Sequence, residues 1–303
     1  MISAPPPSSG GVTLCEMLNV LEGYPLADWG FRSAKAVHVQ IEAMRHAFMD
    51  RNTLLGDPDF VADPSAHLLD PAYAGTLRAA IAPAHAGDSH ALSPGEPPHE
   101  GSNTTHYSIT DRWGNAVSVT TTLNDWFGAR VMASGTGVLL NDEMDDFSAR
   151  PGTPNLYGLV QGRANAIAPG KRPLSSMTPT IVMKDGRLLM VLGTPGGSRI
   201  ITTVLHVILN VVDYGMTIQE AVDAPRFHQQ WLPETTVLER FALSPDTQAL
   251  LVGMGHRFAV APPANHVAAI LVGAPSLGGA PMGANRYYGA NDPRQGTGLA
   301  AGY

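Results

Sequence analysis

Apolar residues in the first hundred positions recur at the spacing of amphipathic α-helices. Positions 14–21 and 37–48 each carry large apolar side chains three or four residues apart, and Gly23 follows the first run. We expect a third helix near 68–81, where Asp70-Pro71 marks either its start or an interruption. The two apolar stripes consist of Leu14, Leu18, Leu21, Val37, Ile41, Met44 and Phe48.

The next stretch, 82–103, lacks this periodicity and is rich in proline, glycine, serine and histidine. Such a composition favours an exposed linker over a packed element. Because exposed segments can be cut without opening a core, the sequence predicts that the chain tolerates cleavage here.

After position 103 the pattern changes to short runs of β-branched and apolar residues bounded by turn residues. Gly114 occupies the tight position of a predicted hairpin turn, and Asp185-Gly186 is the strongest two-residue hairpin signal in the chain. The strands expected around these turns are 104–110, 115–123, 180–184 and 187–193.

The last third of the chain mixes helices and strands. Positions 198–214 are apolar nearly all round, which predicts a buried helix. Thr217 followed by Glu220 is typical of a capping box, and Ser244-Pro245 predicts another helix start. The remaining strands are expected near 258–261 and 266–272. This alternation predicts a layered α+β fold.

Composition excludes several classes of function. A net charge of −7 with scattered Lys and Arg gives no electrostatic footprint for nucleic acid. The single cysteine, Cys15, which we expect to be buried, excludes an internal disulfide and a multi-cysteine metal site. The longest apolar run, 200–212, contains polar residues and is too short for a membrane span. Residues 1–11 lack the features of a signal peptide, so we expect a soluble chain that is cytoplasmic if expressed as given.

Thr104 is the candidate nucleophile. A hydroxyl is a weak nucleophile unless a base lies beside it. A threonine that becomes the first residue of a chain carries that base as its own α-amine, which requires cleavage of the Asn103–Thr104 bond. The alternative is that Thr104 and Thr105 only begin a β-strand.

Four polar clusters lie where predicted strands end or helices begin, the places where sites are usually built. Gly196-Gly197 precede the buried helix, so their N–H groups can bind a phosphate or the oxyanion of a tetrahedral intermediate. A phosphate loop would end in Gly-Lys-Ser/Thr, whereas this stretch ends in Gly-Gly-Ser-Arg, which disfavours phosphate. A simple reversal of the chain is the alternative. The clusters are 120–124, 141–146, 173–176 and 193–198.

Acidic and hydroxyl groups in these clusters suggest a polar ligand. Glu143 with Asp145-Asp146 is either a cation site, for a metal or an ammonium group, or a solvated acidic turn. Ser175 and Ser176 either hydrogen-bond a carboxylate or form a turn beside a proline. We assign His106 a structural role, because a threonine with its own amine needs no imidazole.

The same clusters carry a family resemblance. From Thr104 to about Leu232 the chain resembles the small subunit of the γ-glutamyltransferases (γ-glutamyl transpeptidases), members of the N-terminal-nucleophile hydrolase superfamily. The matching motifs are TTHYS from Thr104, GNAV from Gly114, MDDFS from Met144, KRPLSSM from Lys171, GTPGGSR from Gly193 and APRFH from Ala224. Residues 1–103 resemble the end of the family's large subunit through 5–11 and 55–60, and 289–294 and 301–303 resemble the family's C-terminus.

The resemblance implies roles for the catalytic residues. Thr104 would attack its own preceding carbonyl, separating 1–103 from 104–303, and would then take up the acyl group of the substrate. Thr122 would orient Thr104, and the N–H groups of Gly196 and Gly197 would form the oxyanion hole. The implied reaction transfers a γ-glutamyl group from glutathione or a similar amide to water, an amino acid or a peptide. It passes through a covalent ester and uses no metal or cofactor.

The resemblance also implies a substrate pocket. Asn124, Glu143 and Asp146 would hold the substrate's α-ammonium group. Ser175 and Ser176 would hold its α-carboxylate. A lid over 151–162 would carry Tyr157, which reaches Asn124 across the pocket.

The implied fold is an αββα sandwich, incomplete here because the N-terminal part of the large subunit has no counterpart in this chain. In the family that part carries the signal peptide and an arginine that pairs with the substrate carboxylate. We therefore expect exposed sheet edges and apolar faces, and a partner that supplies the missing large-subunit portion. The family suggests the periplasm or the cell exterior.

Two other functions stay open. An acylase on the same scaffold would cleave a glutaryl-type side chain from a β-lactam, but that substrate lacks the ammonium group that Asp146 and Glu143 would bind. A catalytically inactive chain that only associates with other chains would stay uncut in front of Thr104.

Overall fold

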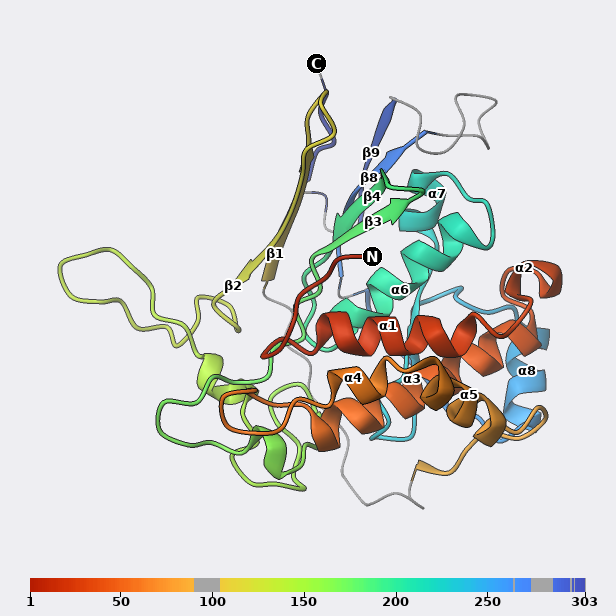
Figure 1. The fold of residues 1–303 in the computed structure, drawn as a ribbon, viewed down its shortest axis with the longest axis horizontal. Coiled ribbons are helices and arrows are strands. Elements are labelled where there is room, and N and C mark those ends of the chain that lie inside the picture. Colours follow the sequence, from red (N-terminus) through yellow and green to blue (C-terminus); the bar gives the residue numbers. More distant parts are fainter. Residues whose placement is uncertain (90–103, 264, 274–285, 295, 297, 303) are drawn as a thin grey trace.

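Two sheets and a layer of helices are stacked in the computed structural model (Figure 1). The structure describes residues 1–89, 104–263, 265–273, 286–294, 296 and 298–302. The helices are α1 (Gly10–Leu21), α2 (Leu26–Trp29), α3 (Ala34–Leu54), α4 (Ser65–Leu68), α5 (Pro71–Ala80), α6 (Arg199–Val212), α7 (Ile218–Asp223) and α8 (Pro245–Gly253), with 3₁₀ turns η2 (Glu143–Asp146) and η3 (Arg163–Asn165). The strands are β1 (Thr104–Thr110), β2 (Ala116–Thr122), β3 (Thr180–Lys184), β4 (Arg187–Gly193), β5 (Phe227–His228), β6 (Thr236–Leu238), β7 (Phe258–Val260), β8 (Ala268–Val272) and β9 (Tyr287–Asn291).

The layers run from a two-stranded sheet to a four-stranded sheet to helices. The β1–β2 hairpin packs on the antiparallel sheet of order β3-β4-β8-β9. Helices α6 and α7 contact the strands of that sheet, α1 packs on α6, and α3 packs on α1 (Figure 1). A small separate sheet joins β5, β6 and β7. The predicted α+β fold is confirmed, as two sheets and one helical layer of an αββα sandwich.

Both amphipathic stripes predicted in the first hundred residues form helices. The stripe residues of α3 are all fully buried because that helix is covered by α1 and α8. Asp70 accepts a hydrogen bond from the N–H of Ala72, and Pro71 occupies the first helical position. Asp70-Pro71 therefore starts α5, so the third helix is shorter than expected from 68–81.

The described part of the predicted linker, 82–89, is mostly exposed, as expected, but its last residue packs against the body of the protein. Ser89 is fully buried, and its N–H donates to Glu234 Oε1 over 2.8 Å. The N–H of Gly87 donates to Glu42 on α3. The expectation of an exposed segment is thus confirmed for most of 82–88 and wrong at Ser89, which is fully buried, while 90–103 lie outside the described residues.

Two hairpins form as their turn residues predict. Asp185 and Gly186 both have positive φ, 50° and 73°, the conformation that lets a two-residue turn follow the twist of β3 and β4. Gly114, with φ of 87°, closes the longer turn between β1 and β2. The strand predictions 104–110, 180–184 and 187–193 are confirmed to the residue.

The β1–β2 hairpin is polar on its inner face and apolar on its outer face. Ser108 and Ser118 point toward the second sheet, where their hydroxyls donate to backbone carbonyls over 3.1 Å. Tyr107, Ile109 and Val117 are 46%, 54% and 48% exposed on the opposite face. An apolar outer face is typical of a sheet that another element or another chain covers.

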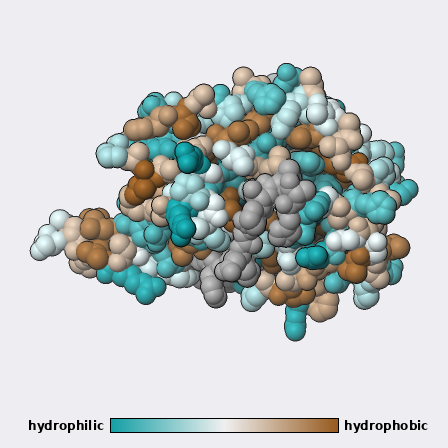
Figure 2. All heavy atoms as spheres, turned by 90° about the horizontal axis from the view of Figure 1, so that it is seen from below, coloured by the Kyte–Doolittle hydropathy of each residue, from teal (hydrophilic) through white to brown (hydrophobic). Residues whose placement is uncertain are grey.

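A long segment between β2 and η2 projects from the body of the protein (Figure 1). The apolar side chains of Val131, Met132 and Val138 are more than half exposed on it. Figure 2 shows hydrophobic side chains on this projection, just behind its outermost end. The expectation of exposed apolar faces is therefore confirmed at two places.

In the last third of the chain the predicted helix starts form as expected, but the structure contains more strands than were predicted. Helix α6 is buried along nearly its whole length, Thr217 and Glu220 form both bonds of a capping box, and Ser244 caps α8. The short strands β5, β6 and β9 were not anticipated. Cys15 is half-buried rather than buried, and burial raises the pKa of its thiol. Among the described residues, no helix combines the length and apolarity needed to cross a membrane.

Candidate active site

One small pocket brings together most of the candidate site residues. It lies where β1, β2, η2 and the start of α6 converge. Its lining consists of Thr104, Thr122, Asn124, Asp146, Tyr157, Ser175, Ser176, Met177, Gly197 and Ile200. Residues predicted from clusters spread over almost a hundred positions thus meet at one place, while Gly196 and Glu143 lie next to this lining.

Thr104 stands at the first position of β1, directly opposite Thr122 at the last position of β2. Its hydroxyl donates to Thr122 Oγ1 over 3.2 Å. The same Thr122 oxygen accepts the N–H of Asn124 over 2.8 Å. The predicted contact between the two threonine hydroxyls is confirmed, and it fixes the direction of the Thr104 side chain.

The glycine pair lies at the N-terminus of α6. The carbonyls of Gly196 and Gly197 accept bonds from Arg199 and Ile200 in the first helical turn. The φ angles of the glycines, 128° and 56°, are costly for any residue with a side chain. A Cβ on Gly197 would come within 2.6 Å of the Tyr157 ring. Backbone geometry and crowding both require glycine, so N–H groups at a helix N-terminus can face the pocket at Gly197.

Asp146, in the pocket lining, and Glu143 beside it form an acidic pair. Burial, followed by the charge of Glu143, raises the pKa of Asp146 well above its ordinary value. Burial also raises the pKa of Glu143, and the hydrogen bond it accepts from Asp146 partly offsets that effect. The pair therefore holds a proton on Asp146 more readily than an exposed carboxyl does, and a bound cation would displace it.

The backbone at Asp146 is held by two amide side chains. Asn165 donates to the Asp146 carbonyl over 2.8 Å and Gln161 over 3.4 Å. Both donors are buried. These bonds fix the turn η2 and so the direction of the Asp146 side chain, which a solvated acidic turn would not require.

Behind Ser175 and Ser176, on the side away from the pocket, lies a buried guanidinium. Arg51, on α3, donates to Ser176 Oγ over 2.7 Å and to Ser9 Oγ over 2.8 Å. The Ser9 hydroxyl accepts the bond from Arg51 and donates to the Ser175 carbonyl. Ser175 and Ser176 are therefore both connected to Arg51 on α3. Burial lowers the pKa of Arg51 to about 10, so this group stays charged at neutral pH.

Tyr157 closes the pocket from the predicted lid. Its hydroxyl donates to Asn124 Oδ1, and its side chain is buried. Asn155 Oδ1 accepts the N–H groups of Tyr157 and Leu159, each over 3.0 Å. The predicted contact between Tyr157 and Asn124 is confirmed, and the loop that carries Tyr157 is packed down onto the pocket.

Two residues of the pocket lining and one residue behind it were not predicted from the sequence. Met177 and Ile200 line the wall and gave no signal beyond their place in the KRPLSSM motif and the apolar helix. Arg51 gave one signal, since it falls one turn after Phe48 on the buried stripe of its helix. His106 lies outside this lining and bonds to Thr120 and Ser108, in keeping with a structural role.

The family model for gamma-glutamyltranspeptidase matches residues 1–302. The chain belongs to the γ-glutamyltranspeptidase family. It is 70% identical to the glutathione hydrolase proenzyme of Pseudomonas sp. (strain A14). The aligned region covers 100% of this chain and 53% of that protein. The chain thus spans about half the length of this relative and of the glutathione hydrolase proenzyme of Escherichia coli (strain K12), to which it is 49% identical.

Two solved structures define the shared fold. A Thr-to-Ala mutant of the Helicobacter pylori γ-glutamyltranspeptidase is 55% identical, with a TM-score of 0.58 over 63% of this chain and 99% of that one. The cephalosporin acylase of Bacillus halodurans is 26% identical, with a TM-score of 0.73 over 96% of this chain and 49% of that one. The N-terminal-nucleophile fold predicted from the motifs is confirmed.

Proposed function

We propose that the chain carries the catalytic centre of a γ-glutamyltransferase that hydrolyses or transfers γ-glutamyl groups of glutathione and similar amides. One observation carries the proposal. Thr104 lines the same pocket as Gly197, Asp146 and Ser176, so a nucleophile, an oxyanion donor, a cation-binding group and an anion-binding group would face one ligand. Glutathione hydrolases among the relatives support this assignment.

The first step is cleavage in front of Thr104. Its hydroxyl oxygen attacks the carbonyl carbon of Asn103, and the C–N bond breaks as the hydroxyl proton passes to the nitrogen. Water then hydrolyses the resulting ester, leaving a carboxylate on Asn103 and a free α-amine on Thr104. This step divides the chain into 1–103 and 104–303, the two regions expected from the sequence.

The second step uses the new amine as the base. It takes the Thr104 hydroxyl proton as Oγ1 attacks the γ-carbonyl carbon of the substrate, and the N–H groups of Gly196 and Gly197 stabilise the oxyanion. The amine returns the proton to the departing amine, and the γ-glutamyl group remains as an ester. Water or an amino acid then attacks that ester by the same route.

Specificity comes from the two ends of the amino-acid moiety. Asp146, with Glu143 and Asn124, binds the α-ammonium, because a cation relieves the unfavourable burial of the carboxylates. Ser175 and Ser176 bind the α-carboxylate, and Arg51 behind Ser176 adds a positive potential. Tyr157 holds Asn124 in place from the lid.

A covering partner completes the enzyme. The exposed apolar face of β1–β2 is where an αββα sandwich places its second helical layer, and relatives are about twice as long as this chain. The partner is the large-subunit portion that these relatives contain. It packs on Tyr107, Ile109 and Val117.

A related acylase is the second candidate, favoured by the fold shared with the cephalosporin acylase. A glutaryl group carries no ammonium, so it would leave Asp146 buried and without a cation. This makes γ-glutamyl the preferred acyl group.

The experiment measures processing and turnover together. The chain is produced alone and together with the N-terminal half of the Pseudomonas sp. A14 relative, and intact mass shows whether it is cut in front of Thr104. Rates with γ-glutamyl and glutaryl anilides are then compared. Cleavage and a γ-glutamyl preference are expected with the partner. An uncut, inactive chain in both preparations contradicts the proposal, and a glutaryl preference identifies the acylase.

A further inference from the structure

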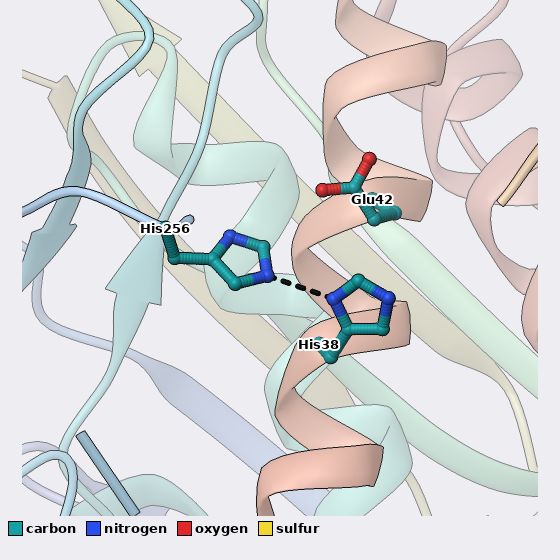
Figure 3. A group of neighbouring side chains, drawn as sticks. All are labelled: His38, Glu42 and His256. Carbon is teal, nitrogen blue, oxygen red and sulfur yellow. Dashed lines mark hydrogen bonds between the residues drawn. The ribbon is translucent and has the colours of Figure 1, made fainter. Parts of the chain in front are cut away.

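A second group of potential ligand atoms lies in the helical layer, away from the pocket. His38 and Glu42 stand one turn apart on α3, and His256 follows α8 (Figure 3). His38 Nδ1 lies 2.8 Å from His256 Nε2, and one ligand atom from each of the three residues lies within 4.8 Å of the others. All three side chains are at most 3% exposed. Buried imidazole and carboxylate groups that converge in this way are the donors that zinc prefers.

Neighbouring groups already orient these donors. The remaining ring nitrogen of His38, Nε2, donates to the carbonyl of Ala82 over 2.8 Å, which leaves Nδ1 as a lone pair directed at His256. The Glu42 carboxylate accepts bonds from Arg45 Nε and from the N–H of Gly87. Metal-binding histidines and carboxylates are typically held by such outer bonds.

The hydrogen bonding of the His256 ring also leaves room for a metal. Among the described residues, His256 Nδ1 has no hydrogen-bond partner. Moving the ring proton from Nε2 to Nδ1 would free Nε2 for a ligand bond without net release of a proton.

The positive charge of Arg45 does not block the site. Arg45 lies near Glu234 Oε1 as well, at 3.5 Å, so its charge stays balanced when Glu42 turns an oxygen toward a cation. Tetrahedral bonds of about 2.1 Å place two nitrogens roughly 3.4 Å apart. The two rings would therefore separate by about half an ångström from their hydrogen-bonded contact.

We propose that His38, Glu42 and His256 bind one divalent transition ion of the zinc class, with water in the fourth position. The ion would join α3 to the segment after α8. These two elements belong to the regions before and after Thr104, so the ion would link them independently of the catalytic pocket.

The test is metal binding by the 303-residue chain. After dialysis against a chelator, the chain is titrated with Zn²⁺ by calorimetry and with Co²⁺ by absorption, which reports tetrahedral coordination. We expect one ion per chain and a rise in the thermal midpoint with Zn²⁺. No stoichiometric binding, or an octahedral Co²⁺ spectrum, overturns the proposal.

Variants then assign the ligands. His38→Gln/His256→Gln replaces the imidazole pair by two amides that can still hydrogen-bond to each other, and Glu42→Gln keeps the shape of that side chain. Loss of outer-shell partners alone costs about 10–100-fold in affinity, so loss of ligands should weaken Zn²⁺ binding by more than about 100-fold. His67→Gln removes an exposed histidine on α4 and should bind as before. Equal Zn²⁺ affinity in all variants overturns the assignment, and thermal midpoints in chelator show that each variant is folded.

Discussion

Arg51 Nη2 lies 2.7 Å from Ser176 Oγ, so a fully buried cation stands directly behind a hydroxyl that lines the pocket. A hydrogen bond to a charged group contributes about 1.5–3 kcal/mol. Arg51→Met should therefore raise KM for a γ-glutamyl anilide about 10–100-fold with a smaller change in kcat. Steady-state rates of the partner-completed enzyme measure this split.

Arg51→Lys keeps the charge but loses the planar fork that also reaches Ser9, so it should recover only part of the affinity. Ser176→Ala is the companion variant, and combining it with Arg51→Met should add little further loss. A purely structural role for Arg51 would instead lower the thermal midpoint and leave KM unchanged in the folded fraction.

Thr122→Val keeps the shape of the side chain and removes the oxygen that accepts from Thr104 and from the N–H of Asn124. We expect self-cleavage to slow by about tenfold, as loss of an orienting bond of about 1 kcal/mol or slightly more predicts. The cleaved fraction over time, read by intact mass, is the measurement. Thr121→Val, on the exposed face of the same strand, should cleave at the original rate.

Gly197→Ala should lower γ-glutamyl turnover by about 100-fold, since a displacement of about 1 Å in a catalytic group has an effect of that size. The added methyl meets the Tyr157 ring and the residue needs positive φ, so the backbone N–H must move. Gly186→Ala is the matched control, because Gly186 also has positive φ but open space around its Cβ position. An equal loss in both variants would mean that backbone strain alone explains the effect.

Asp146→Asn removes the charge that is proposed to bind the ammonium group. Because the pKa of Asp146 is raised, the wild-type site gains its charge, and hence its affinity for γ-glutamyl ligands, as pH rises through that pKa. Calorimetry of γ-glutamyl binding across pH should show this rise in the wild type and a clearly smaller one, from Glu143 alone, in Asp146→Asn. Binding of a glutaryl ligand should not weaken with the substitution.

Burial lowers the pKa of His106 to about 4, below its ordinary value of 6.5. The unfolded chain then binds a proton that the folded chain does not between pH 6.5 and 4, so His106 costs stability as pH falls through that window. His106→Asn should show a smaller drop in thermal midpoint from pH 7 to pH 5 than the wild type. His67→Asn, at an exposed histidine, should follow the wild-type profile.

Sequence patterns predicted the turns, caps and helices that are determined by residues close together in the chain. The Asp185-Gly186 turn, the Thr217 capping box and the stripe on α3 each depend on residues a few positions apart, and all three formed as expected. The strands β5 and β6 hold only two and three residues, too few to establish a period. Their existence depends on pairing with each other and with β7.

Site residues that belong to sequence motifs could be predicted, whereas residues that reach the site only through packing could not. Thr104, Asp146 and Ser176 stand in distinctive motifs, and the structure brings them to one pocket. Arg51 reaches the same place from 125 positions away along the chain, through the packing of α3. Only tertiary structure relates such distant residues, so no pattern around Arg51 could indicate its partner.

The register of the first hairpin has a consequence for the proposed break in the chain. Thr104 and Thr122 form the first pair of the described β1–β2 ladder, so a cut just before Thr104 leaves every described pair of these strands intact. The new N-terminus at Thr104 would stay paired with Thr122 on the neighbouring strand, and its amine would lie beside the hydroxyl of the same residue. Cleavage here would separate the two parts of the chain, while the strand pairing and the hydrogen bond that position the Thr104 hydroxyl remain in place.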